Sequence, residues 1–136
     1  KSQEEGDDYY KLRYEVLRKP LGKPIGSERE EGDKTGIHFA LYDNGGLCAI
    51  VRLDQLANKV SQVRFVAVRE EFRGMGYGSI IMKQVEKYSQ AHGNTEMILH
   101  ARDHAIDFYL NLNYVIAKKS HLLFGTLQHY LMVKKY

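Results

Sequence analysis

A glycine-rich hexapeptide, Arg-Gly-Met-Gly-Tyr-Gly at residues 73–78, carries the residue types of this chain that point most clearly to chemistry. The apolar, β-branched run at 63–68 precedes it and predicts a buried strand. Apolar residues recur at helical spacing over 79–91, which predicts a helix directly after it. Because a helix N-terminus presents unpaired N–H groups and a positive dipole, this turn predicts a site for a phosphate or pyrophosphate.

Two common phosphate loops are excluded. A Walker loop requires Gly-Lys-Ser/Thr, whereas the Gly22-Lys23 pair is followed by Pro24. The dinucleotide fingerprint requires Gly or Ala as its third small residue, where this chain has Ser79. Residues 69–72 also separate the loop from the strand, so the turn is not the tight one of dinucleotide-binding folds.

The pattern that remains is Arg/Gln-x-x-Gly-x-Gly/Ala, and a second motif follows it. Downstream of an expected strand at 96–101, residues 105–114 read Ala-Ile-Asp-Phe-Tyr-Leu-Asn-Leu-Asn-Tyr. Together these motifs resemble the acyl-CoA loop and the Ala-x-x-Phe-Tyr-x-x-x-Gly-Phe segment of the GNAT superfamily of N-acetyltransferases, with Asn and Tyr in the last two places. A helix at 12–18 and the loop after it are similar to a bacterial subgroup, so the resemblance covers residues 12–136.

The resemblance implies a single acyl-CoA N-acyltransferase domain over residues 1–136. Its implied fold is α/β (α+β), with a mixed, mostly antiparallel sheet, a central splayed pair of parallel strands and flanking helices. Only eight mostly polar residues precede Tyr9, so we expect the first strand of that fold to be missing. Acetyl-CoA is the implied cosubstrate, with no metal, and the implied cofactor-binding residues are Val66, Ala67, Val68, Arg73, Gly74, Met75, Gly76, Tyr77, Gly78 and Ser79.

Tyr109 is the expected catalytic residue, because the resemblance places it beside the CoA sulfur. A phenol with a pKa near ~10 is neutral at pH 7 and can protonate a departing thiolate with a pKa around ~8.5. Phe108 and Tyr109 also share an apolar helical stripe, which by periodicity alone predicts a core tyrosine.

The acceptor implied by the family is a primary amine of a small molecule or peptide, which attacks the thioester directly. An alkyl amine has a pKa near ~10.4, so a base or a water relay must remove a proton. The sequence leaves this choice open, and the candidate bases are Glu28, His38, His100 and His104. Two alternatives to amine acetylation also stay open: a non-catalytic acyl-CoA sensor, and an acyltransferase with another acyl donor or acceptor.

Composition limits the class of protein. The chain has 136 residues, 43% of them hydrophobic, a net charge of +3 and no apolar run near the ~20 residues of a membrane span. Its basic residues do not form a stripe interleaved with aromatics, so we expect neither a nucleic-acid nor a membrane partner. The single cysteine, Cys48, lies in an apolar run and predicts a buried side chain in a reducing cytoplasm. A homodimer is left open.

The remaining periodicities place these residues on elements. Residues 1–8 are polar and predicted to fray. Asp-Asn-Gly-Gly at 43–46 between two alternating runs predicts a β-hairpin, and Asn58-Lys59 predicts a second turn. The expected helices are 9–18, 79–91 and 104–112, the expected strands are 38–42, 47–53, 60–68, 96–101, 115–118 and 128–134, and 20–34 is a loop.

Overall fold

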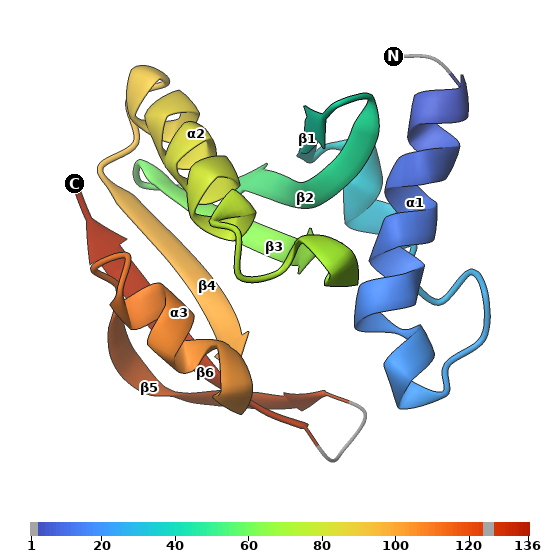
Figure 1. Ribbon diagram of the computed structural model, residues 1–136. Helices are drawn as coiled ribbons and strands as arrows, with labels where there is room; N and C mark the ends of the chain where they lie inside the picture. Colours follow the sequence, from blue (N-terminus) through green and yellow to red (C-terminus); the bar gives the residue numbers. More distant parts are fainter. Residues whose placement is uncertain (1–2, 124–126) are drawn as a thin grey trace. The chain divides into compact units, whose positions relative to one another are not determined.

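The structure, a computed structural model, describes residues 3–123 and 127–136 (Figure 1). Its helices are α1 (Gln3–Leu17), α2 (Tyr77–Ala91) and α3 (Ile106–Leu110), with 3₁₀ turns η1 (Lys19–Leu21), η2 (Glu31–Lys34), η3 (Glu70–Phe72) and η4 (Asp103–Ala105). Its strands are β1 (Ile37–Asp43), β2 (Gly46–Gln55), β3 (Val60–Val68), β4 (Glu96–Arg102), β5 (Val115–Leu123) and β6 (Leu127–Lys135).

The six strands form one sheet in the order β1-β2-β3-β4-β6-β5. Strands β3 and β4 run parallel, whereas β1–β2, β4–β6 and β5–β6 are antiparallel. The expected mixed, mostly antiparallel sheet with one parallel pair is therefore confirmed. The chain divides into two compact units, the first made of residues 1–54 and 65–85 and the second of 55–64 and 86–136. The three boundaries along the chain each fall inside an element, one in β2, one in β3 and one in α2.

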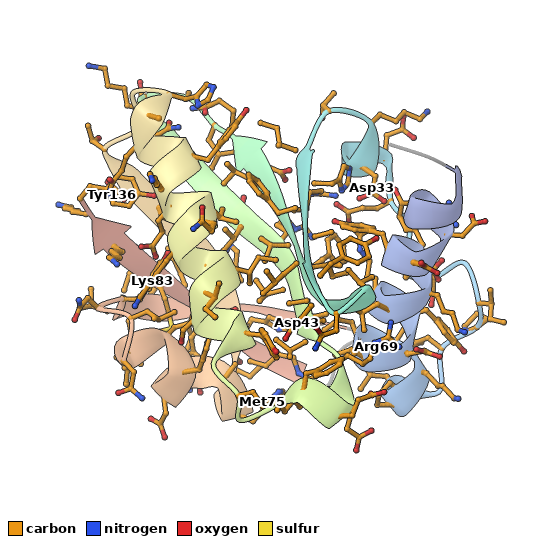
Figure 2. All side chains as sticks on the ribbon, turned by 45° about the horizontal axis from the view of Figure 1, so that its top comes forward. Asp33, Asp43, Arg69, Met75, Lys83 and Tyr136 are labelled. Carbon is orange, nitrogen blue, oxygen red and sulfur yellow. The ribbon has the colours of Figure 1, made fainter. Side chains whose placement is uncertain are left out.

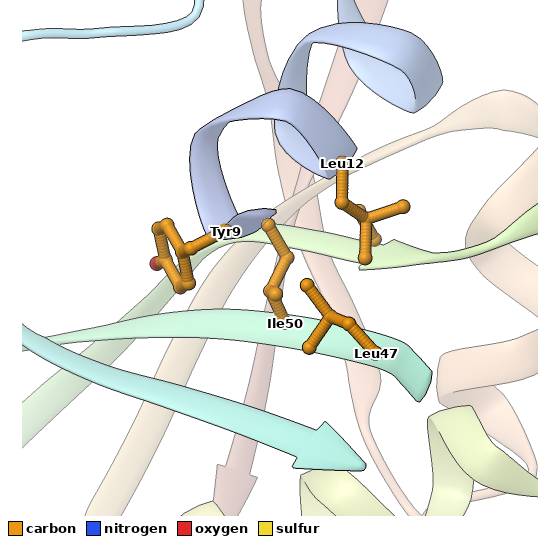
Figure 3. Close-up of a cluster of buried hydrophobic side chains, with 5 residues drawn as sticks. Tyr9, Leu12, Leu47 and Ile50 are labelled. Carbon is orange, nitrogen blue, oxygen red and sulfur yellow. The ribbon is translucent and has the colours of Figure 1, made fainter. Parts of the chain in front are cut away.

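In the first unit, α1 packs on strand β2 through a small apolar core. Tyr9 and Leu12 of the helix lie against Leu47 and Ile50 of the strand, and each of the four is at most 5% exposed (Figure 3). Burying one large apolar side chain contributes about 1.5–3 kcal/mol, so these contacts hold the helix in place. Cys48 is fully buried beside them, as expected.

Helix α1 begins at Gln3, so the predicted helix start at Tyr9 was wrong. Acidic residues in the first turns, including Asp7 and Asp8, lie near the positive end of the helix dipole and favour helix there. The predicted hairpin turn is confirmed, because Asn44 and Gly45 have φ of 53° and 81°, the left-handed values of a two-residue turn.

In the second unit, β4 pairs along its whole length with β6, from Glu96↔Lys135 to Arg102↔His129. Its parallel pairing with β3 runs from Val60↔Glu96 to Gln62↔Ile98. A buried polar group completes this unit: Glu86 accepts hydrogen bonds from the Tyr114 hydroxyl at 2.7 Å and the Lys134 ammonium at 2.8 Å.

Helix α3 is shorter than the predicted 104–112. Residues 103–105 form the 3₁₀ turn η4, and the helix then runs only from Ile106 to Leu110. Asn113, which stands where the family motif has Gly, has a φ of 73°, the left-handed conformation typical of a residue just after a helix. The N–H of Tyr114 then donates to the carbonyl of Tyr109 at 3.0 Å, which closes the end of the helix.

Candidate active site

The glycine loop, residues 73–78, lies in the first unit between η3 and the start of α2. Gly74 and Gly76 have φ of +81° and +86°, a region that glycine enters without the steric cost of a side chain. Helix α2 begins at Tyr77, two residues before the predicted position, and its first hydrogen bond runs from the Ile80 N–H to the Gly76 carbonyl at 3.0 Å. The expected order of strand, loop and helix is confirmed.

Six successive backbone N–H groups, from Gly74 to Ser79, have no acceptor among the residues that the structure describes. Three of them form the first turn of α2, where the helix dipole is positive. The loop is exposed, with Met75 at 62% on the bend before the helix (Figure 2). A Cβ at Gly74 or Gly76 would meet no atom of the chain within 4 Å. The loop thus offers open space in front of unsatisfied donors, the arrangement that binds phosphate groups.

Side chains around the loop fix its position and add charge. The N–H of Arg69 donates to the Cys48 carbonyl and its guanidinium to the Leu47 carbonyl, both at 2.8 Å, which fastens to β2 the segment that leads through η3 into the loop. Arg73 is exposed and donates through Nε to the Val68 carbonyl at 3.3 Å. Its guanidinium therefore places one positive charge at the end of β3, on the residue that directly precedes the six N–H groups.

The first residue of α2 is tied to the β1–β2 hairpin. The Tyr77 hydroxyl donates a hydrogen bond to the Asp43 carboxylate, and the Tyr77 ring meets the Phe72 ring edge to face at 5.6 Å. The hydrogen bond to Asp43 raises the pKa of Tyr77. Figure 2 shows Asp43 on the hairpin near the start of α2. The contact holds the helix end that carries the unsatisfied N–H groups.

The strand that leads into the loop contains a backbone outlier. Phe65 has a φ of +57°, although it lies inside β3 and is not glycine. A left-handed residue costs roughly 1–2 kcal/mol, so surrounding contacts must hold it there. After this bend come residues 66–68, which we predict to contact the cofactor and call the cofactor strand. Ala67 is buried and the two valines are half-buried.

Two buried arginines hold the Phe65 ring. The guanidinium carbon of Arg13 lies 4.1 Å from the ring centroid and that of Arg52 lies 5.1 Å from it. Their side chains are 0% and 1% exposed, and both bond to the Asp33 carboxylate at 2.9–3.0 Å. Asp54 also accepts two hydrogen bonds from Arg52, at 2.9 and 2.7 Å.

The Asp33 carboxylate between the two arginines is ionised. Burial by itself would raise the pKa of Asp33, but hydrogen bonds from the Glu30 N–H, Arg52 and Arg13 outweigh burial and lower it. Sequence patterning gave no signal of this cluster. Arg52 interrupts an apolar strand and Arg13 follows Leu12 on a helix, positions where an arginine is normally expected to reach solvent.

The two candidate bases of the first unit are engaged in other contacts. Glu28 is 4% exposed and accepts hydrogen bonds from the Gly26 N–H at 2.8 Å and from Arg29 Nε at 3.2 Å. The Nε2–H of His38 donates to the Asp33 carbonyl at 2.9 Å, and its Nδ1 lies 2.8 Å from the Tyr9 hydroxyl. These contacts account for both carboxylate oxygens and both ring nitrogens, which fits structural roles.

The expected catalytic residue and the other two histidines lie in the second unit. Tyr109, on α3, is 7% exposed, and its ring meets those of Phe108 and Tyr114 edge to face at 4.9 and 5.8 Å. Burial raises the pKa of Tyr109. His100 is half-buried on β4, and His104 is exposed on η4.

No group of three His, Cys, Asp or Glu side chains within residues 3–123 and 127–136 is placed to hold a metal ion. In the same part of the chain no helix is long and apolar enough to span a membrane.

Comparison with known proteins identifies related chains. Residues 4–114 match the family model for the acetyltransferase (GNAT) family. The uncharacterized N-acetyltransferase YjcF of Bacillus subtilis is 27% identical over 134 residues, which are 98% of this chain and 95% of that protein. A putative N-acetyltransferase from Lactobacillus plantarum has the same fold, with a TM-score of 0.87, 22% identity and coverage of 98% and 92% of the two chains. So does an aminoglycoside 6'-N-acetyltransferase solved with coenzyme A, at a TM-score of 0.82, 17% identity and the same coverages.

Proposed function

The chain belongs to the acetyltransferase (GNAT) family, and on this premise we propose that it moves an acetyl group from acetyl-CoA to a primary amine of a small molecule or peptide. One observation carries the proposal: six unsatisfied N–H groups, from Gly74 to Ser79, at the start of α2. They fit a pyrophosphate, since each can donate one hydrogen bond to a phosphate oxygen without the chain giving up an existing bond. The solved relative with coenzyme A supports the same ligand.

Acetyl-CoA supplies an acetyl thioester, an acyl group already activated for attack by an amine. In our proposal Arg73 adds charge beside the pyrophosphate. The cofactor strand, residues 66–68, pairs with the pantetheine arm as a neighbouring strand would, and the N–H near Val66 donates to the thioester carbonyl as negative charge develops on its oxygen.

Proton transfer completes the proposed reaction. The amine nitrogen forms a bond to the carbonyl carbon, the carbon–sulfur bond breaks, and the sulfur leaves with the electron pair. The amine proton goes to water or to a base, and the Tyr109 hydroxyl gives its proton to the sulfur and regains one from solvent. The engagement of Glu28 and His38 in other contacts favours a water relay over either side chain.

The test is an acceptor screen with amines, polyamines, amino acids and peptides that follows release of free CoA with a thiol reagent. The only cysteine, Cys48, is fully buried, so the reagent reports CoA rather than the protein. CoA release that depends on an amine, with one acetylated product per thiol, supports the proposal. Tight CoA binding without release for any acceptor would favour a non-catalytic sensor, and release only with another acyl-CoA would favour a different donor.

A further inference from the structure

The left-handed backbone of Phe65 requires an explanation, because nothing in its own chemistry favours it. A strained non-glycine residue persists only where its surroundings over-determine it, and such residues gather at functional sites. Phe65 immediately precedes the cofactor strand, residues 66–68. Its φ therefore sets the direction in which that backbone leaves the bend.

The contacts around the ring are unusually complete. Arg13 reaches it from α1 and Arg52 from β2, with guanidinium carbons 4.1 and 5.1 Å from the ring centroid. Arg18 adds a third contact from the end of α1, at 5.6 Å. A cation over an aromatic face is attracted by the ring quadrupole, and more strongly when both are removed from water.

The arginines are themselves held rigidly. Asp33 accepts from both of them, so neither can leave the ring without losing a buried ion pair. The fit around Arg52 is close: a Cβ at Gly36 would lie 2.7 Å from the Arg52 stem, and one at Gly32 would lie 2.9 Å from its guanidinium. The chain thus provides glycine at two places where a side chain would push this arginine away.

We propose that the two buried arginines, held against the ring of Phe65, are positioning residues that fix the direction of the cofactor strand for acyl transfer. The inference rests on the proposed function. Neither arginine is placed against the reacting atoms; each acts through the ring and through φ at residue 65. Without the ring contacts the strand relaxes toward ordinary extended backbone, and the N–H near Val66 no longer points at the thioester oxygen.

The first test removes the ring and keeps its apolar bulk. Phe65→Leu should lower kcat with acetyl-CoA at least tenfold and leave the Kd of CoA within about threefold, because the glycine loop is fastened to β2 independently through Arg69. Phe65→Tyr keeps the ring and should stay within about threefold of the wild type in both quantities. Phe39→Leu makes the same change at another half-buried strand position and should leave kcat unchanged.

The second test changes an arginine of the clamp, which is the Phe65 ring together with Arg13 and Arg52. Arg13→Lys keeps the charge but loses the guanidinium that lies over the ring, so it should lower kcat, by no more than Phe65→Leu does, because Arg52 and Arg18 still contact the ring. The double variant should have the same kcat as Phe65→Leu, because the ring contact that Arg13→Lys weakens is already absent there. Additive losses, or equal losses in kcat, CoA affinity and melting temperature, would overturn the proposal by showing a general packing role.

A third measurement does not depend on turnover. In ¹⁵N–¹H spectra of Phe65→Leu and Arg13→Lys, the amide signals of residues 66–68 should move, those of the glycine loop should not, and Phe65→Tyr should resemble the wild type. If the wild type acetylates no amine but these signals move as expected, the proposed function fails and the clamp stands. If they stay in place in both variants, the clamp is wrong whatever the enzyme does.

Discussion

At the scale of single residues, the role proposed for Tyr109 separates into a ring that packs and a hydroxyl that donates a proton. Tyr109→Phe keeps the edge-to-face contacts with Phe108 and Tyr114 and removes only the oxygen. General acid catalysis is commonly worth ~10²–10⁴-fold, so we expect kcat to fall at least tenfold while CoA affinity and melting temperature hold. All three quantities would be measured on the same preparation.

A second buried tyrosine supplies the control. The Tyr114 hydroxyl donates to the buried Glu86, so Tyr114→Phe leaves a carboxylate short of a donor and should cost about 1–3 kcal/mol of stability. Its kcat, measured well below the melting temperature, should be unchanged. If Tyr109→Phe instead loses stability and keeps its turnover, the tyrosine belongs to the core and the acid is another group.

The pH dependence of turnover tests the same assignment from another side. Burial raises the pKa of Tyr109 above its ordinary value near ~10. A general acid must be protonated, and a raised pKa moves proton loss to higher pH. We therefore expect kcat to show no fall between about pH 7 and about pH 10, while kcat/KM rises as the amine acceptor deprotonates. A decline in kcat with an apparent pKa between about 8 and 9 would point to a different acid.

Arg73 is predicted to contribute charge rather than shape. Arg73→Ala should weaken CoA binding by about three- to tenfold at low salt, and the deficit should shrink as salt screens the pair. Calorimetric titration with CoA and with pantetheine, which lacks phosphate, would show the loss only for CoA. As a control, Lys83→Ala removes an equal charge from the exposed side of α2 and should have little effect on CoA binding. If Arg73→Ala weakened the binding of pantetheine as much as that of CoA, Arg73 would support the loop structurally.

At the scale of elements, the glycine loop depends on backbone conformation. Gly76 has a φ of +86°, where a β-branched residue is a strong outlier. Because no atom of the chain lies within 4 Å of its missing Cβ, Gly76→Val acts through backbone strain and through bulk in front of the donors. We expect the Kd of CoA to rise at least tenfold, equivalent to about 1.4 kcal/mol, as measured by calorimetry.

Gly93, which lies just after the C-terminal end of α2, provides a matched control for this prediction. Its φ is +87° and its missing Cβ also faces open space, so Gly93→Val introduces the same backbone strain. Both variants should lose similar stability, and only Gly76→Val should lose CoA affinity. Equal CoA affinity in the two proteins would remove the glycine loop from the binding site.

Elements with a strong local signal were predictable from sequence, and those set by distant contacts were not. The hairpin at 43–46, the glycine turn before α2 and the left-handed Asn113 each follow from local turn chemistry. The start of α1 and the length of α3 were wrong, because favourable end charges extended one helix and a 3₁₀ turn shortened the other. The clamp around Phe65 left no trace in periodicity, since it joins α1, β2 and β3 through charged side chains that normally face solvent.

At the scale of the whole molecule, the prediction of the mixed sheet succeeded through motif order rather than through composition. Two short motifs in the expected order indicated the family, and proteins of that family have this type of sheet. The roles of individual residues stay predictions, because they depend on how side chains face a ligand. We expected a single domain, and the chain forms two compact units that share strands β2 and β3 and helix α2. These three continuous elements affect how the protein unfolds.

A ligand that binds only the folded first unit should stabilise both units, because neither can unfold without breaking β2, β3 and α2. CoA at one hundred times its Kd adds about 2.7 kcal/mol. For a chain of this size that corresponds to a rise in melting temperature of roughly 8–13 °C. Scanning calorimetry should show one transition that moves as a whole with CoA and moves little with pantetheine. Two transitions, of which only one responds to CoA, would contradict this prediction by showing that the units unfold separately.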